Sequence, residues 1–263
     1  MAVTDVEAGG YRISWGYTQM SGQSPRKTGA LVITQNEVRA IDVAAVESLG
    51  IPGLLLMENA ARGVSEHLDR VCSIGRVMII CGPGNNGGDG LALARQRAAA
   101  GKESRVVLVS TGKSLTADTQ SNLDFLINSG VPVQTVNNDS ECQMLLDDLK
   151  PEDWIIDSLL GTGVRGELRA PFNLWVQAIN ASPAKVLAVD VPSGMNSDDG
   201  TGGADCVHAD LTVTFVGVKR GFIHASAETY TGEVAVAPIG IPLTWLQGWL
   251  LSHRADNAMG DLS

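Results

Sequence analysis

Seven short runs of apolar residues recur in the chain, with helical patterns between most of them. We expect strands at residues 76–81, 105–109, 131–136, 154–159, 185–191, 211–216 and 233–237, and helices near residues 54–68, 89–100, 116–129, 140–149 and 171–179. Most of the runs lack polar–apolar alternation, which is typical of parallel strands that are covered on both faces. Because alternating strands and helices form right-handed crossover units, the sequence predicts an α/β fold. We expect a single-domain, Rossmann-like, doubly wound and mostly parallel sheet with helices on both faces.

The two ends of the chain give different signals. Residues 1–31 show no apolar periodicity, so we expect a loose N-terminal arm followed by one folded domain over residues 32–263. Thr34 and Glu37 have the spacing of a capping box, which predicts the start of a helix. Near the other end, LTWLQGWLL presents an apolar face that packs either on the core or on a partner, and we expect a homodimer.

Composition narrows the classes of partner and site. The formal net charge of -10 disfavours binding to nucleic acid or to an acidic membrane. The chain has no apolar run of the roughly 18 residues that span a bilayer and no apolar secretory signal, so we expect a cytoplasmic protein. The four cysteines and four histidines lack zinc-site spacing, and we expect the histidines at surface or loop positions.

The glycine-rich motif GPGNNGGDG occupies residues 82–90, directly after the first predicted strand. Gly82, Gly84 and Gly87 match the GxGxxG pattern of dinucleotide-binding turns. Such glycines let backbone N–H groups approach a diphosphate at the start of a helix. The next strand ends in VSTGKS, without the acid that binds the ribose of NAD. The motif favours a nucleotide-like ligand over a purely structural turn, and it argues against a conventional NAD-dependent dehydrogenase.

Two further motifs follow other predicted strands. DSLLGTGVRGE spans residues 157–167 and VDVPSGMN spans residues 189–196. Asp157 and Asp190 are carboxylates near the ends of apolar strands, where burial is unfavourable without a cation or hydrogen-bond donors. Ligands of open α/β sheets bind at this edge. The sequence therefore favours a ligand site here, while a carboxylate bound by the N–H groups of its own turn is the alternative for each aspartate.

Three other motifs are weaker. TGKS at residues 111–114 lacks the first glycine of a phosphate-binding P-loop, and PSG at residues 192–194 lacks the first glycine of a nucleophile elbow. In MENAAR, residues 57–62, Glu58 and Asn59 follow LLL. They either point into the site or only fix helix packing.

MENAAR, GPGNNGGDG, DSLLGTG and VDVPSGMN, in this order, resemble the NAD(P)H-hydrate epimerase family, the YjeF N-terminal domain. TVTFVGVKRGF and TGEVAVAPIGIP are also similar, so the resemblance covers about residues 32–242. It implies an isomerase of cofactor repair that interconverts the R and S forms of hydrated NADH or NADPH at carbon 6 of the nicotinamide ring. It also implies a bound potassium ion.

The resemblance assigns roles position by position. Asn86, Asp157 and Ser193 match the potassium ligands, and their amide, carboxylate and hydroxyl oxygens suit this hard cation. The residues that match substrate contacts are Asn85, Asn86, Gly87, Gly88, Asp89, Gly161, Thr162, Gly163, Val164, Arg165, Gly166, Glu167 and Asp190.

The implied reaction requires a hydroxyl to leave and return through an iminium-like nicotinamide. A group that protonates the leaving hydroxyl and later accepts a proton from water would serve, and nearby carboxylates would stabilise the cation. We expect Asp190 to be this catalytic residue, with Asp157 as the second choice. Some family members have lysine at the position of Arg165, where arginine cannot transfer protons near neutral pH.

Many family members continue into an ATP- or ADP-dependent dehydratase domain, whereas this chain ends about twenty residues after Pro242. We therefore expect a separate dehydratase to act downstream. A non-catalytic nucleotide-binding or scaffold module on the same fold is the alternative. Asn86, Asp157, Asp190 and Ser193 together favour the enzyme, because a scaffold has no need for all four.

Overall fold

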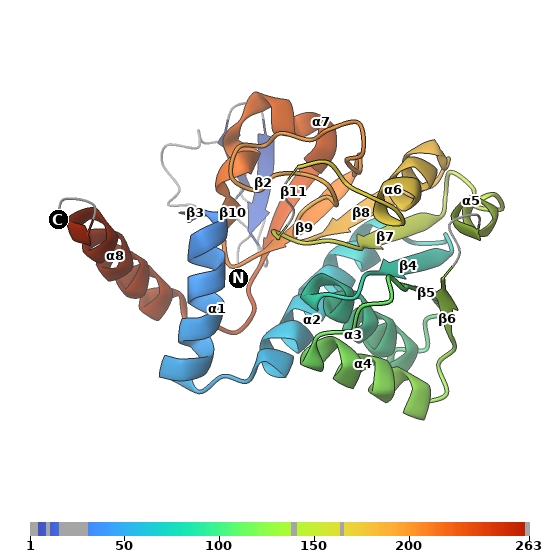
Figure 1. Cartoon of the computed structure of the whole chain (residues 1–263), viewed down its shortest axis with the longest axis horizontal. Helices are drawn as coiled ribbons and strands as arrows, with labels where there is room; N and C mark the ends of the chain where they lie inside the picture. The colour runs from blue at the N-terminus through green and yellow to red at the C-terminus, as the bar shows by residue number, and fades with distance from the viewer. Residues whose placement is uncertain (1–4, 9–10, 16–30, 138–140, 164–165, 261–263) are drawn as a thin grey trace.

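The computed structural model describes residues 5–8, 11–15, 31–137, 141–163 and 166–260. Nine strands of this part form one sheet in the order β1-β2-β11-β9-β8-β7-β4-β5-β6 (Figure 1). The strands are β1 (Asp5–Ala8), β2 (Tyr11–Trp15), β4 (Val77–Cys81), β5 (Arg105–Val109), β6 (Val133–Val136), β7 (Trp154–Ser158), β8 (Lys185–Val189), β9 (Leu211–Phe215) and β11 (Glu233–Ala237). All neighbouring pairs are parallel except β1 and β2. The mostly parallel sheet is therefore confirmed.

The strand order reverses at β4. From β4 the chain runs outward through β5 and β6, and then returns to the other side of β4 with β7, β8 and β9. The carboxyl ends of β4 and β7 thus flank a topological switch point, where ligands of such sheets bind. The three motifs with glycines and carboxylates follow β4, β7 and β8, so they all lie near this point.

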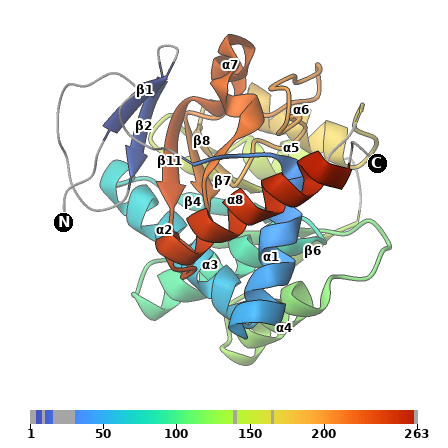
Figure 2. The same cartoon turned by 90° about the vertical axis from the view of Figure 1, so that its left-hand side faces the viewer.

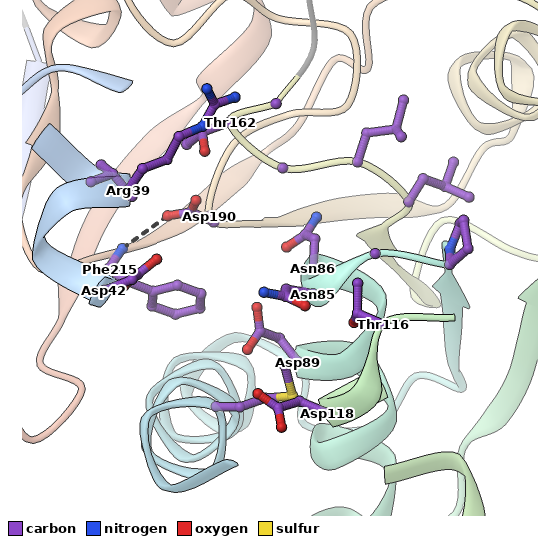
Figure 3. Close-up of a pocket in the computed structure, with 18 of the residues that line it drawn as sticks. Arg39, Asp42, Asn85, Asn86, Asp89, Thr116, Asp118, Thr162, Asp190 and Phe215 are labelled. Atoms are coloured by element: carbon purple, nitrogen blue, oxygen red, sulfur yellow. Dashed lines mark hydrogen bonds between the residues drawn. The ribbon is translucent and has the colours of Figure 1, made fainter. Parts of the chain in front are cut away.

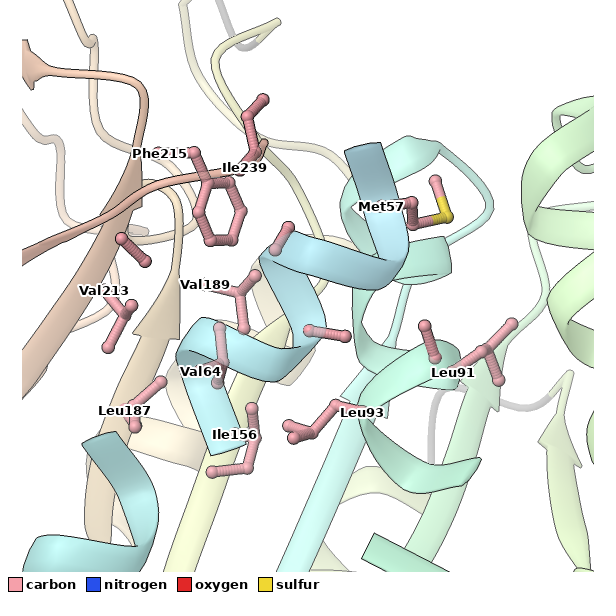
Figure 4. Close-up of a cluster of buried hydrophobic side chains, with 14 of the residues drawn as sticks. Met57, Val64, Leu91, Leu93, Ile156, Leu187, Val189, Val213, Phe215 and Ile239 are labelled. Carbon is pink, nitrogen blue, oxygen red and sulfur yellow. The ribbon is translucent and has the colours of Figure 1, made fainter. Parts of the chain in front are cut away.

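Helices cover both faces of the sheet, as the sequence predicts. They are α1 (Gln35–Leu49), α2 (Gly53–Val71), α3 (Asn85–Ala99), α4 (Ala117–Asn128), α5 (Glu141–Leu146), α6 (Phe172–Ala181), α7 (Glu228–Thr231) and α8 (Leu243–Gly260). Successive residues of β4 belong to two cores on opposite faces: Ile79 packs with α2, α3 and α4, whereas Ile80 packs with α5 and α6. Figure 4 shows Val64 of α2 and Leu93 of α3 packed over Ile156 of β7 in the first of these cores.

The helix starts agree with the local signals, with one correction. At α1, Glu37 N donates to Thr34 Oγ1 over 3.2 Å and Thr34 N donates to Glu37 Oε2 over 2.8 Å, which confirms the capping box. The third helix begins at Asn85, inside the glycine-rich motif, and not near Asp89. Glycine is needed within its first turns because a Cβ at Gly90 would lie 2.6 Å from Ser158 Oγ of the sheet.

The N-terminal residues correct a second expectation. Asp5–Ala8 and Tyr11–Trp15 form β1 and β2, and β2 pairs with β11 at the edge of the sheet. An arm without regular structure is therefore wrong for these nine residues, while the rest of residues 1–30 lies outside the described part. YRISW, which forms β2, does alternate polar and apolar residues, but five residues are too few to establish a period. A second, two-stranded sheet pairs β3 (Val32–Ile33) with β10 (Val218–Lys219).

The C-terminal helix lies across α1 (Figure 2). Leu246 and Leu250 are buried in the same core as α2 and α3, and Arg254 Nε donates to Glu37 Oε1 over 2.6 Å. The apolar face of LTWLQGWLL therefore packs on the chain's own core, which was the first of the two alternatives. A homodimer stays a prediction. Within the described ranges, no helix combines the length and apolar character needed to cross a membrane.

Candidate functional site

A cavity of about 1330 Å³ opens at the carboxyl ends of the central strands (Figure 3). One wall comes from α1 and the start of α2, and the facing wall comes from the turn after β4 and the loop after β7. Asp190 follows β8 and Phe215 ends β9 at its back. Each of the three motifs contributes residues to this one space, as their strand-end positions predict.

The glycine-rich turn joins β4 closely to α3. A Cβ at Gly82 would lie 1.9 Å from Leu159 O, and a Cβ at Gly87 would lie 1.8 Å from Gly82 O. Only glycine fits at either position, because backbone atoms occupy the space. The N-cap of α3 is Gly84, and no side chain caps this helix. The helix start, with its N–H groups and positive dipole end, is thus left to the cavity and suits an anionic group.

Asn86 lies in the first turn of α3 and is 8% exposed. Neither its amide nitrogen nor its amide oxygen has a hydrogen-bond partner in the part of the chain that the structure describes. A buried amide without partners is unfavourable by about 1–3 kcal/mol. Such an orphaned group at a strand edge indicates that a ligand satisfies it.

Asp157 is the penultimate residue of β7 and is completely buried. Its Oδ2 accepts a hydrogen bond from Ser193 N over 2.8 Å, and its Oδ1 accepts one from Ser193 Oγ over 2.6 Å. Burial raises the pKa of Asp157 to about 6, although the bonds from Ser193 oppose the rise. Ser193 Oγ also lies 3.2 Å from Leu160 O, so carboxylate, hydroxyl and carbonyl oxygens gather at this point.

Asp190 has an unusual backbone and a charged partner. Its φ is +67°, a left-handed conformation that is uncommon for residues other than glycine and is often found at functional sites. Its Oδ1 lies 2.7 Å from Lys219 Nζ and accepts hydrogen bonds from Thr214 Oγ1 and Phe215 N. Lys219 is only 1% exposed and also donates to Phe215 O. The carboxylate of Asp190 is thus held at the cavity wall by a buried cation.

Two more carboxylates face the same space. Asp42 reaches it from α1 and Asp89 from α3, so that with Asp190 three elements each contribute one acid (Figure 3). Burial and the negative charge of Asp190 raise the pKa of Asp42 to about 6, while Lys219 opposes the rise. Because more than a third of Asp42 stays exposed, water in the cavity tempers this effect. Burial, followed by the charges of Asp190 and Asp42, also raises the pKa of Asp89 well above its ordinary value.

The structure brings together most of the predicted substrate residues. Those that line the cavity are Asn85, Asn86, Asp89, Gly161, Thr162, Gly163, Glu167 and Asp190. Gly87 and Gly88 lie beneath the cavity wall in the packing of α3, and Gly166 lies outside the lining. Val164 and Arg165 are outside the described residues. Asp157 and Ser193 lie behind the wall, next to Leu160, which does line it.

The contacts of Glu58 and Asn59 decide whether these residues point into the site or fix helix packing. Glu58 forms an ion pair with Arg95 and accepts a hydrogen bond from Gln96, which joins α2 to α3. Asn59 Nδ2 donates to Ile239 O after β11. Both residues therefore fix helix packing. His67 differs from the prediction of a surface histidine, because it is buried on α2 with Nδ1 2.8 Å from Gly63 O.

Sequence reasoning missed Lys219 and Asp42. Lys219 ends the otherwise apolar run TVTFVGVK, and a lone cation there was a usable signal, since lysine is seldom fully buried without a partner. Asp42 lies on a helix beside Ile41, and nothing in the local pattern distinguishes it from a solvent-facing acid.

Comparisons with known proteins show to which family the chain is similar. Residues 53–221 match the family model described as YjeF-related protein N-terminus. The chain is 39% identical over 215 residues to the NAD(P)H-hydrate epimerase of Rhodopirellula baltica, covering 82% of this chain and 86% of that one. The NAD(P)H-hydrate epimerase of Pirellula staleyi is 35% identical over 216 residues, covering 82% and 95% of the two chains.

Two further proteins are similar over different shares of their length. A bifunctional NAD(P)H-hydrate repair enzyme of Pyrobaculum aerophilum is 40% identical over 218 residues, which are 80% of this chain and 42% of that one. The crystal structure of yeast ynu0 matches with a TM-score of 0.63 and 25% sequence identity, covering 73% of this chain and 82% of that one.

Proposed function

This chain belongs to the family of the YjeF-related protein N-terminus, and from that premise we propose that it is an NAD(P)H-hydrate epimerase. Its reaction is the interconversion of the R and S hydrates of NADH and NADPH. The observation that carries the proposal is the convergence of Asn86, Asp89, the loop at Gly161–Gly163 and Asp190 on one cavity at the switch point.

The cavity suits the two ends of such a substrate. The uncapped start of α3 is a place for the diphosphate, because N–H groups and the helix dipole favour anions there. Arg39, Lys113 and Arg169 also line the cavity and add positive charge for phosphates. Asp42 and Asp190 supply negative charge, which would stabilise a positively charged nicotinamide intermediate.

Within this reaction we assign the two predicted catalytic aspartates different places. Asp190 lines the cavity and is available to the reacting carbon. Asp157 is completely buried behind the wall and is engaged by Ser193, so it supports the site from beneath. Asp190 therefore remains the first choice for contact with the nicotinamide ring.

The residues at the base of the site fit a potassium ion. Asn86 has a buried amide without a partner in the described ranges, and it comes close to Gly161 on the loop that follows Asp157. Asn86, Asp157 and Ser193 would hold the ion through oxygen atoms of the kind that potassium prefers. When bound, potassium would supply the positive charge that compensates the buried Asp157 carboxylate.

The alternative of a non-catalytic binding module is less favoured. A scaffold needs neither a left-handed Asp190 nor a buried lysine that holds this aspartate at the cavity. Local strain of about 1–3 kcal/mol persists where the surrounding structure enforces it, commonly at active sites.

An assay with the two substrate forms tests the proposal. The purified chain is incubated with mixed R and S hydrates of NADH and a separate S-specific dehydratase, whose action removes the S form. We expect the R form to disappear much faster than its spontaneous epimerisation allows. Consumption of the R form at only the spontaneous rate would refute the epimerase function.

A further inference from the structure

Asp42 is an acid in the cavity without a bonding role in the fold. It lines the cavity from α1, more than a third of it is exposed, and it forms no hydrogen bond or ion pair with any described residue. Its electrostatic neighbours are Asp190 and Lys219. Asp42 faces the like charge of Asp190 and makes no bond to a described residue, so it contributes little to the stability of the fold. Such a carboxylate in a cavity points to a role in the reaction.

Asp190 is already engaged by other groups of the fold. Its Oδ1 lies 2.7 Å from Lys219 Nζ, and Lys219 is almost completely buried. The same oxygen accepts hydrogen bonds from Thr214 Oγ1 and Phe215 N. Asp190 is therefore fixed at the cavity wall, where its negative charge is suited to stabilise positive charge on the ring.

We propose that Asp42 is a further catalytic residue, which exchanges the proton with the hydroxyl at carbon 6 while Asp190, paired with Lys219, faces the ring. This inference rests on the proposed epimerase function. It moves the proton transfer, which the sequence assigned to Asp190, to a carboxyl that is open to water and makes no bond to a described residue.

The step balances without any oxidant or reductant. The bond between carbon 6 and the hydroxyl oxygen breaks, its electron pair goes to the oxygen, and the oxygen takes the proton of Asp42 to become water. The lone pair of the ring nitrogen forms the double bond of the iminium ion, whose charge Asp190 faces. Water then adds to either face of carbon 6, and its extra proton returns to the carboxylate of Asp42.

The surroundings of Asp42 support proton exchange near neutral pH. Burial and the charge of Asp190 across the cavity raise the pKa of Asp42 to about 6, and Lys219 opposes the rise. The other charged residues that line the same cavity are Arg39, Glu47, Asp89, Lys113, Asp118, Glu167 and Arg169. A carboxyl with a pKa near the working pH is an efficient general acid and base.

The test compares Asp42→Asn with the matched control Glu47→Gln. Glu47 is an exposed acid on the same helix and at the rim of the same cavity, so the control removes equal charge from a position without an assigned role. We expect Asp42→Asn to lower kcat by about 100-fold or more, with KM little changed. The thermal midpoint should stay equal or rise, because the variant removes repulsion with Asp190.

Two further readouts separate proton transfer from a structural effect. In wild type, incubation in ¹⁸O-labelled water should place the label on carbon 6 as the R form turns over, and Asp42→Asn should lose labelling and turnover together. The fall of kcat on the alkaline side of the pH profile, where Asp42 loses the proton that it must donate, should shift in Asp42→Glu and vanish in Asp42→Asn.

The outcomes are distinguishable. An inactive wild type refutes the proposed function and this inference with it. An active wild type with kcat of Asp42→Asn within about threefold of it, or with an equal loss in Glu47→Gln, overturns the role of Asp42 alone. A fall in kcat that comes with a lower thermal midpoint and a raised KM would show a structural role and would also overturn it.

Discussion

Replacement of Lys219 by methionine should destabilise the protein far more than loss of a surface lysine. Methionine retains much of the apolar stem but removes the ammonium group that lies 2.7 Å from Asp190 Oδ1 and also donates to Phe215 O. Lys219 is 1% exposed, whereas the side chain of Asp190 is 13% exposed at the cavity. The variant therefore leaves a carboxylate without its cation in a partly desolvated place.

The size of the effect follows from burial. Removal of one partner from a buried ion pair typically lowers the free energy of unfolding by about 3–5 kcal/mol. Water in the cavity can reach Asp190 in part, so we expect a loss near the lower limit, about 3 kcal/mol. Lys102 and Asp69 form a pair with the same 2.7 Å separation at the surface. Because exposed pairs contribute at most about 1 kcal/mol, Lys102→Met should change stability little.

Urea unfolding of a double-mutant cycle measures the pair directly. The variants are Lys219→Met, Asp190→Asn and the two combined, each with its free energy of unfolding and its dependence on urea. We expect the double variant to be about 2 kcal/mol more stable than the sum of the single losses, because neither charge is then left alone. Single losses that add within about 0.5 kcal/mol would refute the coupling.

Three other predictions concern the base of the site. Burial raises the pKa of Asp157 to about 6, above that of the unfolded chain, so in tetramethylammonium buffer the free energy of unfolding should fall as pH rises from about 4 to 6. Potassium chloride should reverse this fall, measured by urea unfolding at each pH. Without potassium, Asn86→Ala should leave the free energy of unfolding equal or raise it by about 1 kcal/mol, because the variant removes a buried amide that has no partner in the described part. The variant should also abolish the potassium-dependent rise in thermal midpoint. Gly87→Ala should unfold the turn, or destabilise it by more than about 3 kcal/mol, because the new Cβ would lie 1.8 Å from the backbone oxygen of Gly82. Gly88→Ala should be milder in thermal unfolding, because its Cβ would meet side-chain atoms only, of Met57 and of Thr119, each at 2.7 Å.

Each of these has a control and a contrary result. Asp157→Asn should remove the fall in the free energy of unfolding between pH 4 and 6, together with its reversal by potassium. An unchanged fall would show that other carboxylates cause it. A potassium response that survives Asn86→Ala would exclude this amide as a ligand. Equal losses in Gly87→Ala and Gly88→Ala would contradict the distinction between rigid backbone and flexible side chain.

The sequence by itself determined the layers of the fold and the edge where the site lies. Continuous apolar runs of five or six residues predict buried parallel strands, and the motifs with glycines and carboxylates directly follow three of them. These are local signals, because strand burial and glycine turns depend on residues that are neighbours in the chain. Asn86 and Asp190 could therefore be placed in one site before any contact was known.

Tertiary structure alone decided which charges meet. Lys219 at the end of β10 meets Asp190, which follows β8, and Asp42 enters the cavity because α1 lies over the carboxyl ends of the strands. No period or spacing encodes such pairings, because they depend on how elements distant in sequence dock. The same reason explains β2, whose five residues become a strand by pairing with β1 and with β11. Local pattern thus fixed where the site would form, and long-range docking fixed its electrostatics.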